Sequence, residues 1–168
     1  MPVSLSIDGS PMAIESRSSG IEFFAARKSV VALRVDGELR DLATDLATLP
    51  EGSVVESVDI SSQDGLNILR HSTAHVLAQA VQQVYPDARL GIGPFIEDGF
   101  YYDFGNIDAV TPELLRDLEK RMKRIVKEGQ TFRRREVSDA DAAAELAGQP
   151  YKLELVSTKG AGAEGSSV

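Results

Sequence analysis

The sequence contains no cysteine, so disulfide bonds cannot stabilise the fold, and a cytoplasmic location is expected. No stretch approaches the roughly 18 consecutive apolar residues of a membrane-spanning helix. The amino terminus, MPVSLSIDGS, lacks the basic and apolar segments of a secretory signal peptide. These absences predict a cytoplasmic chain that makes no membrane contact.

Histidine is also scarce, since the only two, His71 and His75, stand in the stretch RHSTAHVLAQA. At this spacing the two side chains lie one helical turn apart and can share a zinc ion, a water molecule or a phosphate. Zinc needs further protein ligands, and the sequence offers no cysteine and no third histidine. Ser72 also stands where the metalloprotease helix pattern has glutamate. No metal site is therefore expected.

A second use of the pair is to position a water molecule for hydrolysis, because neutral imidazole can accept a proton near pH 7. Two exposed histidines without a function are the alternative, since this spacing also arises by chance. Helical periodicity places His71 and His75 on a face shared with Ala78 and Gln82, away from the apolar side. The apolar side is predicted to comprise Leu69, Thr73, Val76, Leu77, Ala80 and Val84.

The first 60 residues are predicted to form a small sheet with one helix. Asp-Gly pairs in IDGS and VDGE are typical of hairpin turns. The segment GIEFFAARKS is long enough for about two helical turns. Strands are predicted at VSLSI, VVALRV and SVVESVDI. Two hairpins, a helix and a closing strand indicate a β-grasp fold.

A polar break, SSQDG at residues 61–65, then separates two predicted domains, with Asp64 as a candidate N-cap. The helix that follows is expected to run to Tyr85, because Pro86 disfavours helical geometry in the residue before it. Next, ARLGIGPFIEDGFYYDFG predicts a hairpin that turns at Glu97-Asp98-Gly99, with FYYDF as an aromatic strand.

The segment TPELLRDLEKRMKRIVKEG carries the signals of a complete helix. Thr111 is a candidate N-cap, Pro112 and Glu113 suit the first turn, Lys127 the last turn, and Gly129 the end. The apolar stripe is predicted to be Leu115, Leu118, Met122 and Ile125. A short helix at SDADAAAELAG, a strand at YKLELV and a low-complexity tail are expected after it.

Charge is unevenly distributed along the chain. The formal net charge is −8, yet residues 116–135 hold nine basic and three acidic residues, a net charge of +6 that leaves −14 for the remainder. Such a strip is either a solvated helix face or a contact surface for a phosphate backbone. The basic residues are Arg116, Lys120, Arg121, Lys123, Arg124, Lys127, Arg133, Arg134 and Arg135.

The long segment LNILRHSTAHVLAQAVQQVYPDARLGIGPFIEDGFYYDF strongly resembles the editing domain of bacterial threonyl-tRNA synthetases. Upstream, VVALRVDGELRDLATDL resembles their TGS domain, and LEKRMKRIVKEGQTFRRREVS and YKLEL follow in the same order. Alanyl-tRNA synthetases share the histidine helix but are not expected to share the GIGPFIEDGFYYDF block. The resemblance implies an α+β chain: an ubiquitin-like β-grasp (TGS) domain at 1–61, an incomplete α+β editing domain at 66–156, and a flexible tail at 157–168.

The same resemblance implies roles for matched positions. His71 and His75 correspond to half of the site that hydrolyses mischarged seryl-tRNA(Thr), Lys152 to a lysine lining that site, and Tyr102 to its aromatic wall. The basic strip then becomes an expected contact for the acceptor end of tRNA(Thr). Serine and threonine differ by one methyl group, which yields only about 1–3 kcal/mol of discrimination, so a second, hydrolytic site is needed.

Several parts of such a synthetase do not occur in the 168 residues. The resemblance places a cysteine and a histidine of the editing site in a CRGPH block, and the block is not found here. ATP, magnesium and zinc are implied for a catalytic core that is also not found, and homodimer contacts are expected in that core. The chain alone is therefore expected neither to aminoacylate nor to edit efficiently. A free-standing, non-catalytic module that binds RNA or protein is the alternative.

Overall fold

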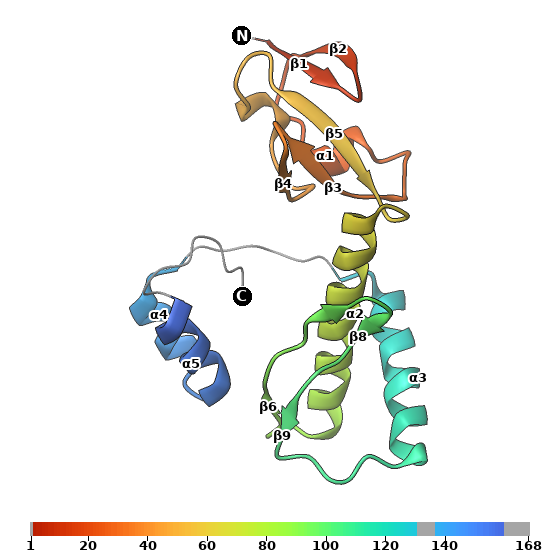
Figure 1. The fold of residues 1–168 in the computed structure, drawn as a ribbon, viewed down its shortest axis with the longest axis vertical. Coiled ribbons are helices and arrows are strands. Elements are labelled where there is room, and N and C mark those ends of the chain that lie inside the picture. The colour runs from red at the N-terminus through yellow and green to blue at the C-terminus, as the bar shows by residue number, and fades with distance from the viewer. Residues whose placement is uncertain (1, 131–136, 160–168) are drawn as a thin grey trace. The chain divides into compact units, whose positions relative to one another are not determined.

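The computed structural model describes residues 2–130 and 137–159, and the chain divides into two compact units, Met1–Arg70 and His71–Val168 (Figure 1). Each unit combines helices with strands, so the predicted α+β class is confirmed. None of the helices in the described ranges is long and apolar enough to cross a bilayer.

The first unit is built on a five-stranded mixed sheet. Its strands follow the order β2-β1-β5-β3-β4, in which β5 runs parallel to β1 and antiparallel to β3. The three strands predicted from β-branched runs are all present, and this topology is compatible with the expected β-grasp fold. The strands are β1 (Val3–Ile7), β2 (Ser10–Ile14), β3 (Val30–Val35), β4 (Glu38–Arg40) and β5 (Val54–Asp59).

Both predicted hairpin turns are confirmed. Asp8 and Gly9 have φ angles of 47° and 79°, and Asp36 and Gly37 have φ angles of 49° and 90°. Positive φ at both central residues is what a two-residue hairpin turn with the right twist requires, and aspartate and glycine tolerate it. The sequence of the turns thus sets the pairing of β1 with β2 and of β3 with β4.

Helix α1 (Gly20–Phe23) is shorter than the two turns predicted. Ser19 and Glu22 form a capping box at its start, but the backbone then tightens, with Arg27 N–H bonded to the carbonyl of Phe24. A short 3-10 helix, η1 (Leu46–Thr48), follows β4. Between these turns and the sheet lies the core of the unit, which includes Leu5, Ile7, Phe24, Leu33, Leu46 and Val55.

Asp59, at the end of β5, caps the following turn. One carboxylate oxygen accepts hydrogen bonds from the Ser61 N–H at 3.0 Å and the Ser61 hydroxyl at 2.7 Å. Hydrogen bonds from Ser29 and then Ser61 lower the pKa of Asp59 from 3.8 to about 2. Because the folded pKa lies below the ordinary value, the stabilisation is complete above the ordinary value and is lost as pH falls through about 2.

The variant Asp59→Asn is therefore expected to be less stable than the parent chain at pH 5. The difference shrinks at pH 2.5, because Asp59 of the unfolded parent is protonated below its ordinary pKa of 3.8 while the folded chain still holds the carboxylate ionised. Urea unfolding followed by circular dichroism at both pH values measures this. The control is Glu15→Gln, which removes an exposed carboxylate that bonds no other described residue. A stability difference that stays constant with pH contradicts the prediction.

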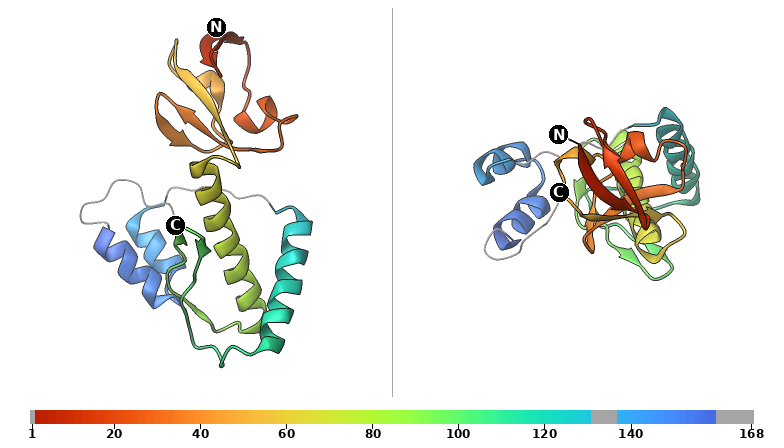
Figure 2. Two further views of the ribbon diagram at one scale, coloured as in Figure 1. Left: turned by 45° about the vertical axis from the view of Figure 1, so that its right-hand side comes forward. Right: turned by 90° about the horizontal axis from the view of Figure 1, so that it is seen from above.

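The second unit contains a long hairpin and most of α2 (Gln63–Val84), which ends one residue before the predicted Tyr85 (Figure 2). Strand β6 (Arg89–Leu90) pairs with β9 (Phe104–Gly105), and β7 (Phe95–Ile96) pairs with β8 (Gly99–Phe100). Ile96 lies opposite Gly99, so the turn is where the sequence predicts it. The FYYDF segment is strand only at its ends, since residues 101–103 are irregular.

Helix α3 (Pro112–Glu128) packs beside α2 (Figures 1 and 2), and its predicted caps, Thr111 and Gly129, are confirmed. Leu118 and Ile125 are buried against Ala80 and Val81 of α2. The predicted stripe is wrong at Leu115, which is 55% exposed. Leu114 packs against the core instead, because the face buried against α2 is rotated by about one residue at the start of the helix.

Two further predictions are wrong. Asp64 is not the N-cap of α2: the Ser62 hydroxyl accepts the Gly65 N–H at 3.1 Å, and Asp64 lies in the first turn, where it pairs with Arg34. The segment YKLELV is helical, not a strand, and belongs to α5 (Pro150–Lys159). Proline suits the first turn of a helix, and lysine, leucine and glutamate favour its interior.

The predicted short helix is confirmed as α4 (Asp139–Glu145), with Ser138 as its N-cap. Helix α5 extends to Lys159, so the first three residues of the predicted flexible tail, 157–159, are helical. The rest of that tail, 160–168, lies outside the described residues.

Candidate functional site

His71 and His75 are in direct contact on α2. Their Nε2 atoms lie 3.2 Å apart, and the rings are perpendicular, with centroids 4.7 Å apart. A hydrogen bond at this distance needs one ring to donate N–H and the other to accept. If both rings were protonated, neither could accept, and this bond would be lost.

The environment of His75 favours its neutral form. Partial burial removes water from the ring and lowers the pKa of His75 below 6.5, and the nearby charges of His71 and Lys152 lower it further. The side chain as a whole remains exposed, so shielding is partial and water can still reach it. At neutral pH, His75 therefore has a free or shared nitrogen lone pair that can accept a proton.

The histidines lie at the edge of a buried arc that is wider than the sequence indicates. Ala80 is buried as expected, but Ala74, Ala78 and Val81 are buried too. The prediction that Ala78 shares an exposed face with the histidines is wrong, because the helix is covered on more than one side.

The predicted apolar side of α2 is also wrong at Leu69, which is 43% exposed. The residues of this helix that pack with α3 begin farther along the chain, at Val76 and Leu77. Helical periodicity therefore gives the direction of the apolar face but not the point at which another element covers it.

Lys152, on α5, is the predicted residue that the structure brings toward the pair. It is half-buried, and this burial lowers its pKa below the ordinary value of 10.5. Its charge is among the causes of the low pKa of His75, so the ammonium group lies within electrostatic range of the ring. Side chains from α2 and α5, which are far apart in the sequence, therefore influence each other's charge.

Tyr102 is held separately from the histidines. Its ring stacks on Phe104, with centroids 4.7 Å apart and planes 15° apart, and burial raises its pKa above 10.0. A Cβ on Gly93 would overlap the Tyr102 ring, so only glycine leaves room for it. Among the described residues, no hydrogen bond or ring contact joins Tyr102 to His71 or His75.

A cavity of about 280 Å³ opens beside His75, between α2 and the end of α3. Gln79 donates a hydrogen bond to Gln130 across it at 3.1 Å. Gln79 follows His75 by one helical turn, so sequence spacing could have identified it, whereas Gln130 comes from another segment. The lining residues are His75, Val76, Gln79, Ile125, Val126, Gly129 and Gln130.

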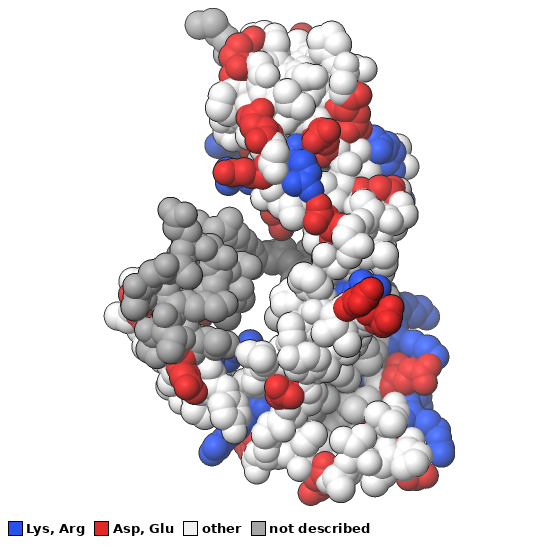
Figure 3. Space-filling view, viewed as in Figure 1, with Lys and Arg blue, Asp and Glu red and all other residues white. Residues whose placement is uncertain are grey.

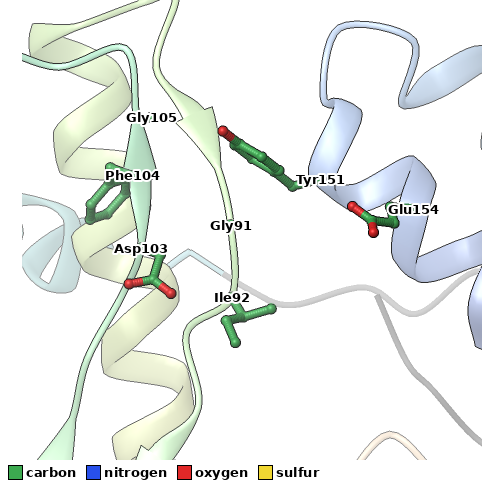
Figure 4. A pocket seen from close by; sticks show the side chains of 7 residues that line it. All are labelled: Gly91, Ile92, Asp103, Phe104, Gly105, Tyr151 and Glu154. Carbon is green, nitrogen blue, oxygen red and sulfur yellow. The ribbon is translucent and has the colours of Figure 1, made fainter.

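A second cavity, of about 380 Å³, lies between the hairpin and α5. In Figure 4, Tyr151 extends from α5 toward the strands that carry Gly91 and Gly105. None of the predicted site residues lines this cavity. Within residues 2–130 and 137–159, no three histidine, aspartate or glutamate side chains come together as a metal site would need.

Comparison with known proteins shows what the chain is similar to. No family model matches the sequence. The threonine-tRNA ligase of Cutibacterium acnes is 60% identical over 155 residues, which are 92% of this chain and 22% of that protein. The threonine-tRNA ligase of Leifsonia xyli subsp. xyli is 59% identical over 157 residues, or 94% and 22%. That of Micrococcus luteus is 50% identical over 167 residues, or 98% and 24%.

The chain is related to threonine-tRNA ligases. This confirms the predicted resemblance, since threonyl-tRNA synthetase is another name for these ligases. The chain spans about a fifth of the length of the relatives that it matches, for example 22% of the Cutibacterium acnes ligase.

Within α3, acidic side chains pair with most of the basic residues of the predicted strip. Helix α3 carries six basic and four acidic residues, a net charge of +2, and acidic patches alternate with basic ones along it in Figure 3. Lys120 and Lys127 pair with no described acidic residue. The ion pairs are Arg116–Glu113, Arg121–Asp117, Lys123–Glu119 and Arg124–Glu128, at 3.5, 2.7, 2.6 and 3.8 Å.

The basic residues also differ in position around α3. Arg121 is only 30% exposed at its side chain and lies toward the buried face, whereas the other five are exposed. Arg124 additionally donates to Gln83 of α2 at 2.8 Å. Arg133, Arg134 and Arg135 lie outside the described residues.

Proposed function

We propose that this region forms the TGS domain (1–61) and part of the editing domain (66–156) of a threonine-tRNA ligase, and that His71 and His75 help to hydrolyse mischarged seryl-tRNA(Thr). The 3.2 Å contact between the two imidazoles is the observation that carries the proposal. Similarity to threonine-tRNA ligases over more than nine-tenths of the chain supports it.

The chemistry of the pair suits ester hydrolysis. His75, kept neutral by its surroundings, accepts a proton from a water molecule while that water attacks the ester carbonyl. His71 orients the His75 ring through the shared hydrogen bond. The Lys152 ammonium attracts the negative charge that develops on the carbonyl oxygen. The protonated His75 then gives its proton to the leaving oxygen as the ester bond breaks, giving serine and tRNA with a free terminal hydroxyl.

The rest of the proposed enzyme lies in other parts of the ligase. We expect the catalytic core, with its ATP, magnesium and zinc, to attach threonine to tRNA(Thr) in the cytoplasm and to provide the homodimer contacts. The editing site also needs residues beyond the four predicted here. These 168 residues therefore supply one part of the hydrolytic site and part of the surface for the tRNA acceptor end.

The proposal is tested by the rate at which a complete ligase containing this region deacylates seryl-tRNA(Thr), before and after alanine replaces both histidines. A large loss of deacylation with threonylation retained supports the editing role. Unchanged deacylation excludes it and favours the alternative of a non-catalytic module that binds RNA or protein.

The charge pattern of α3 predicts which side chains contact tRNA. In the complete ligase, Lys120→Glu combined with Lys127→Glu is expected to weaken tRNA binding more than Arg121→Glu does, because Arg121 already pairs with Asp117. If both lysines contact phosphates, the slope of log affinity against log salt falls by about 1.5–2. Filter binding across a salt series measures both quantities. Equal affinities for the parent and the lysine variant would contradict the assignment.

A further inference from the structure

Helix α5 is attached to strand β6 by the side chain of Gln149, the residue just before the helix. The Oε1 atom of Gln149 accepts a hydrogen bond from the Leu90 N–H at 2.8 Å, and its Nε2 atom donates to the Ala88 carbonyl at 3.4 Å. The amide thus pairs with a donor and an acceptor of one strand edge, much as a neighbouring strand would. These bonds join positions that are 59 and 61 residues apart in sequence.

Gln149 also begins the turn that carries Lys152. The Gln149 carbonyl accepts hydrogen bonds from the Lys152 N–H at 2.9 Å and the Leu153 N–H at 3.1 Å. Tyr151 adds a contact with β9, because its hydroxyl lies 3.3 Å from the position of a Cβ on Gly105. Figure 4 shows the ring directed at the pair of strands that continue to Gly91 and carry Gly105. The first turn of α5 is therefore held by both strands of the β6–β9 pair.

We propose that Gln149 is a positioning residue of the histidine site, which keeps Lys152 within electrostatic range of His75 by fixing the first turn of α5 to strand β6. Hydrogen bonds are short-ranged and directional, so a side chain that bonds two backbone groups at once defines the position of the turn. The catalytic importance of Gln149 rests on the proposed function. The positioning itself is a property of this chain and can be measured without any substrate.

Displacement of Lys152 has a measurable consequence for His75. A nearby positive charge disfavours the imidazolium form and so lowers the histidine pKa. If the first turn of α5 moves away, this influence weakens and the pKa of His75 rises. The charge of His71 acts in the same direction as Lys152, but it belongs to α2 and is expected to stay. Partial burial of the ring also lowers the pKa, and any burial lost as α5 moves raises the pKa further.

The experiment is an NMR pH titration of His75 in the 168-residue chain and its variants. Lys152→Met is expected to raise the pKa of His75. Gln149→Met, which keeps the side-chain volume but forms neither bond, is expected to raise it as well. In the double variant the effects on the His75 pKa are not additive, because Gln149 acts through Lys152.

Gln149→Asn, which is one methylene too short to reach both partners, is a second test if Gln149→Met unfolds. Gln63→Met is the matched control, since the Gln63 side chain bonds only Asn67 among the described residues.

Hydrogen exchange at the Leu90 amide tests the contact itself. Faster exchange in Gln149→Met, and not in Lys152→Met, is expected because only the former removes the acceptor of that N–H. The proposal is overturned if the His75 pKa in Gln149→Met equals the parent value while that in Lys152→Met is higher, or if the two effects add. Unchanged deacylation after replacement of both histidines would exclude the editing role but would not affect the titration results. The two proposals can therefore be contradicted independently.

Discussion

Replacement of both His71 and His75 by alanine in the complete ligase is expected to slow hydrolysis of seryl-tRNA(Thr) by about 100-fold or more, with threonylation retained. General-base catalysis typically contributes about 10²–10⁴-fold to a rate. His71 and His75 are the only two histidines in the sequence, and their rings are in contact. Pre-steady-state deacylation of purified seryl-tRNA(Thr), beside threonylation of the same tRNA, measures the two activities.

The 3.2 Å contact adds a sharper expectation about the single variants. Because the rings share one hydrogen bond, His71→Ala leaves His75 disoriented, and each single variant should lose nearly as much activity as the double variant. Gln82→Ala, on the same helix, is the matched control and should retain deacylation. Losses that multiply between the single variants would show that the histidines act independently, and equal deacylation by all variants would remove the pair from the reaction.

Local sequence signals predicted helix ends and turns well where a single residue type has the required hydrogen bond or backbone conformation. Thr111 and Gly129 mark the ends of α3 because a hydroxyl can accept an N–H and glycine tolerates left-handed φ, here 63°. The strand predicted at residues 151–156 was wrong. Lysine, leucine and glutamate fit both the alternation of a strand and the periodicity of a helix, and Pro150 favours a helix start. The rotation of the buried face from Leu115 to Leu114 depends on how α3 packs on α2, which periodicity alone does not determine.

The same limit applies to the site. The spacing of His71 and His75 predicted that they share one side of a helix, and the structure places their rings in direct contact. That Lys152 lies within electrostatic range of His75 could be inferred only from the resemblance, since it depends on contacts between segments about 60 residues apart, such as Gln149 with β6. The neutralisation of the basic strip was likewise missed, although the spacing of Lys123 and Glu119 is the ordinary one for a helical ion pair.

Gly65→Ala is expected to destabilise the first unit by about 2 kcal/mol. Alanine normally stabilises a helix relative to glycine by about 1 kcal/mol. At Gly65, however, a Cβ would overlap the carbonyl oxygen of Asp59 and lie 2.8 Å from the Cα of Ile60. Both are backbone atoms that cannot rotate away, and overpacking of this kind costs about 1–3 kcal/mol or more. The clash therefore outweighs the gain in helix propensity.

Relief of the clash would require movement of the first turn of α2 away from β5. That movement breaks local bonds, because the same Asp59 carbonyl accepts the Ser62 N–H at 2.9 Å and the Ser62 hydroxyl at 2.6 Å. Urea unfolding followed by circular dichroism gives the free energy of unfolding of the variant and of the control Gly148→Ala. Gly148 has nothing within 4 Å of the position that a methyl group would take and no left-handed φ, so alanine there should be neutral or stabilising. A Gly65→Ala chain as stable as Gly148→Ala would mean that α2 starts farther from β5 than this structure places it.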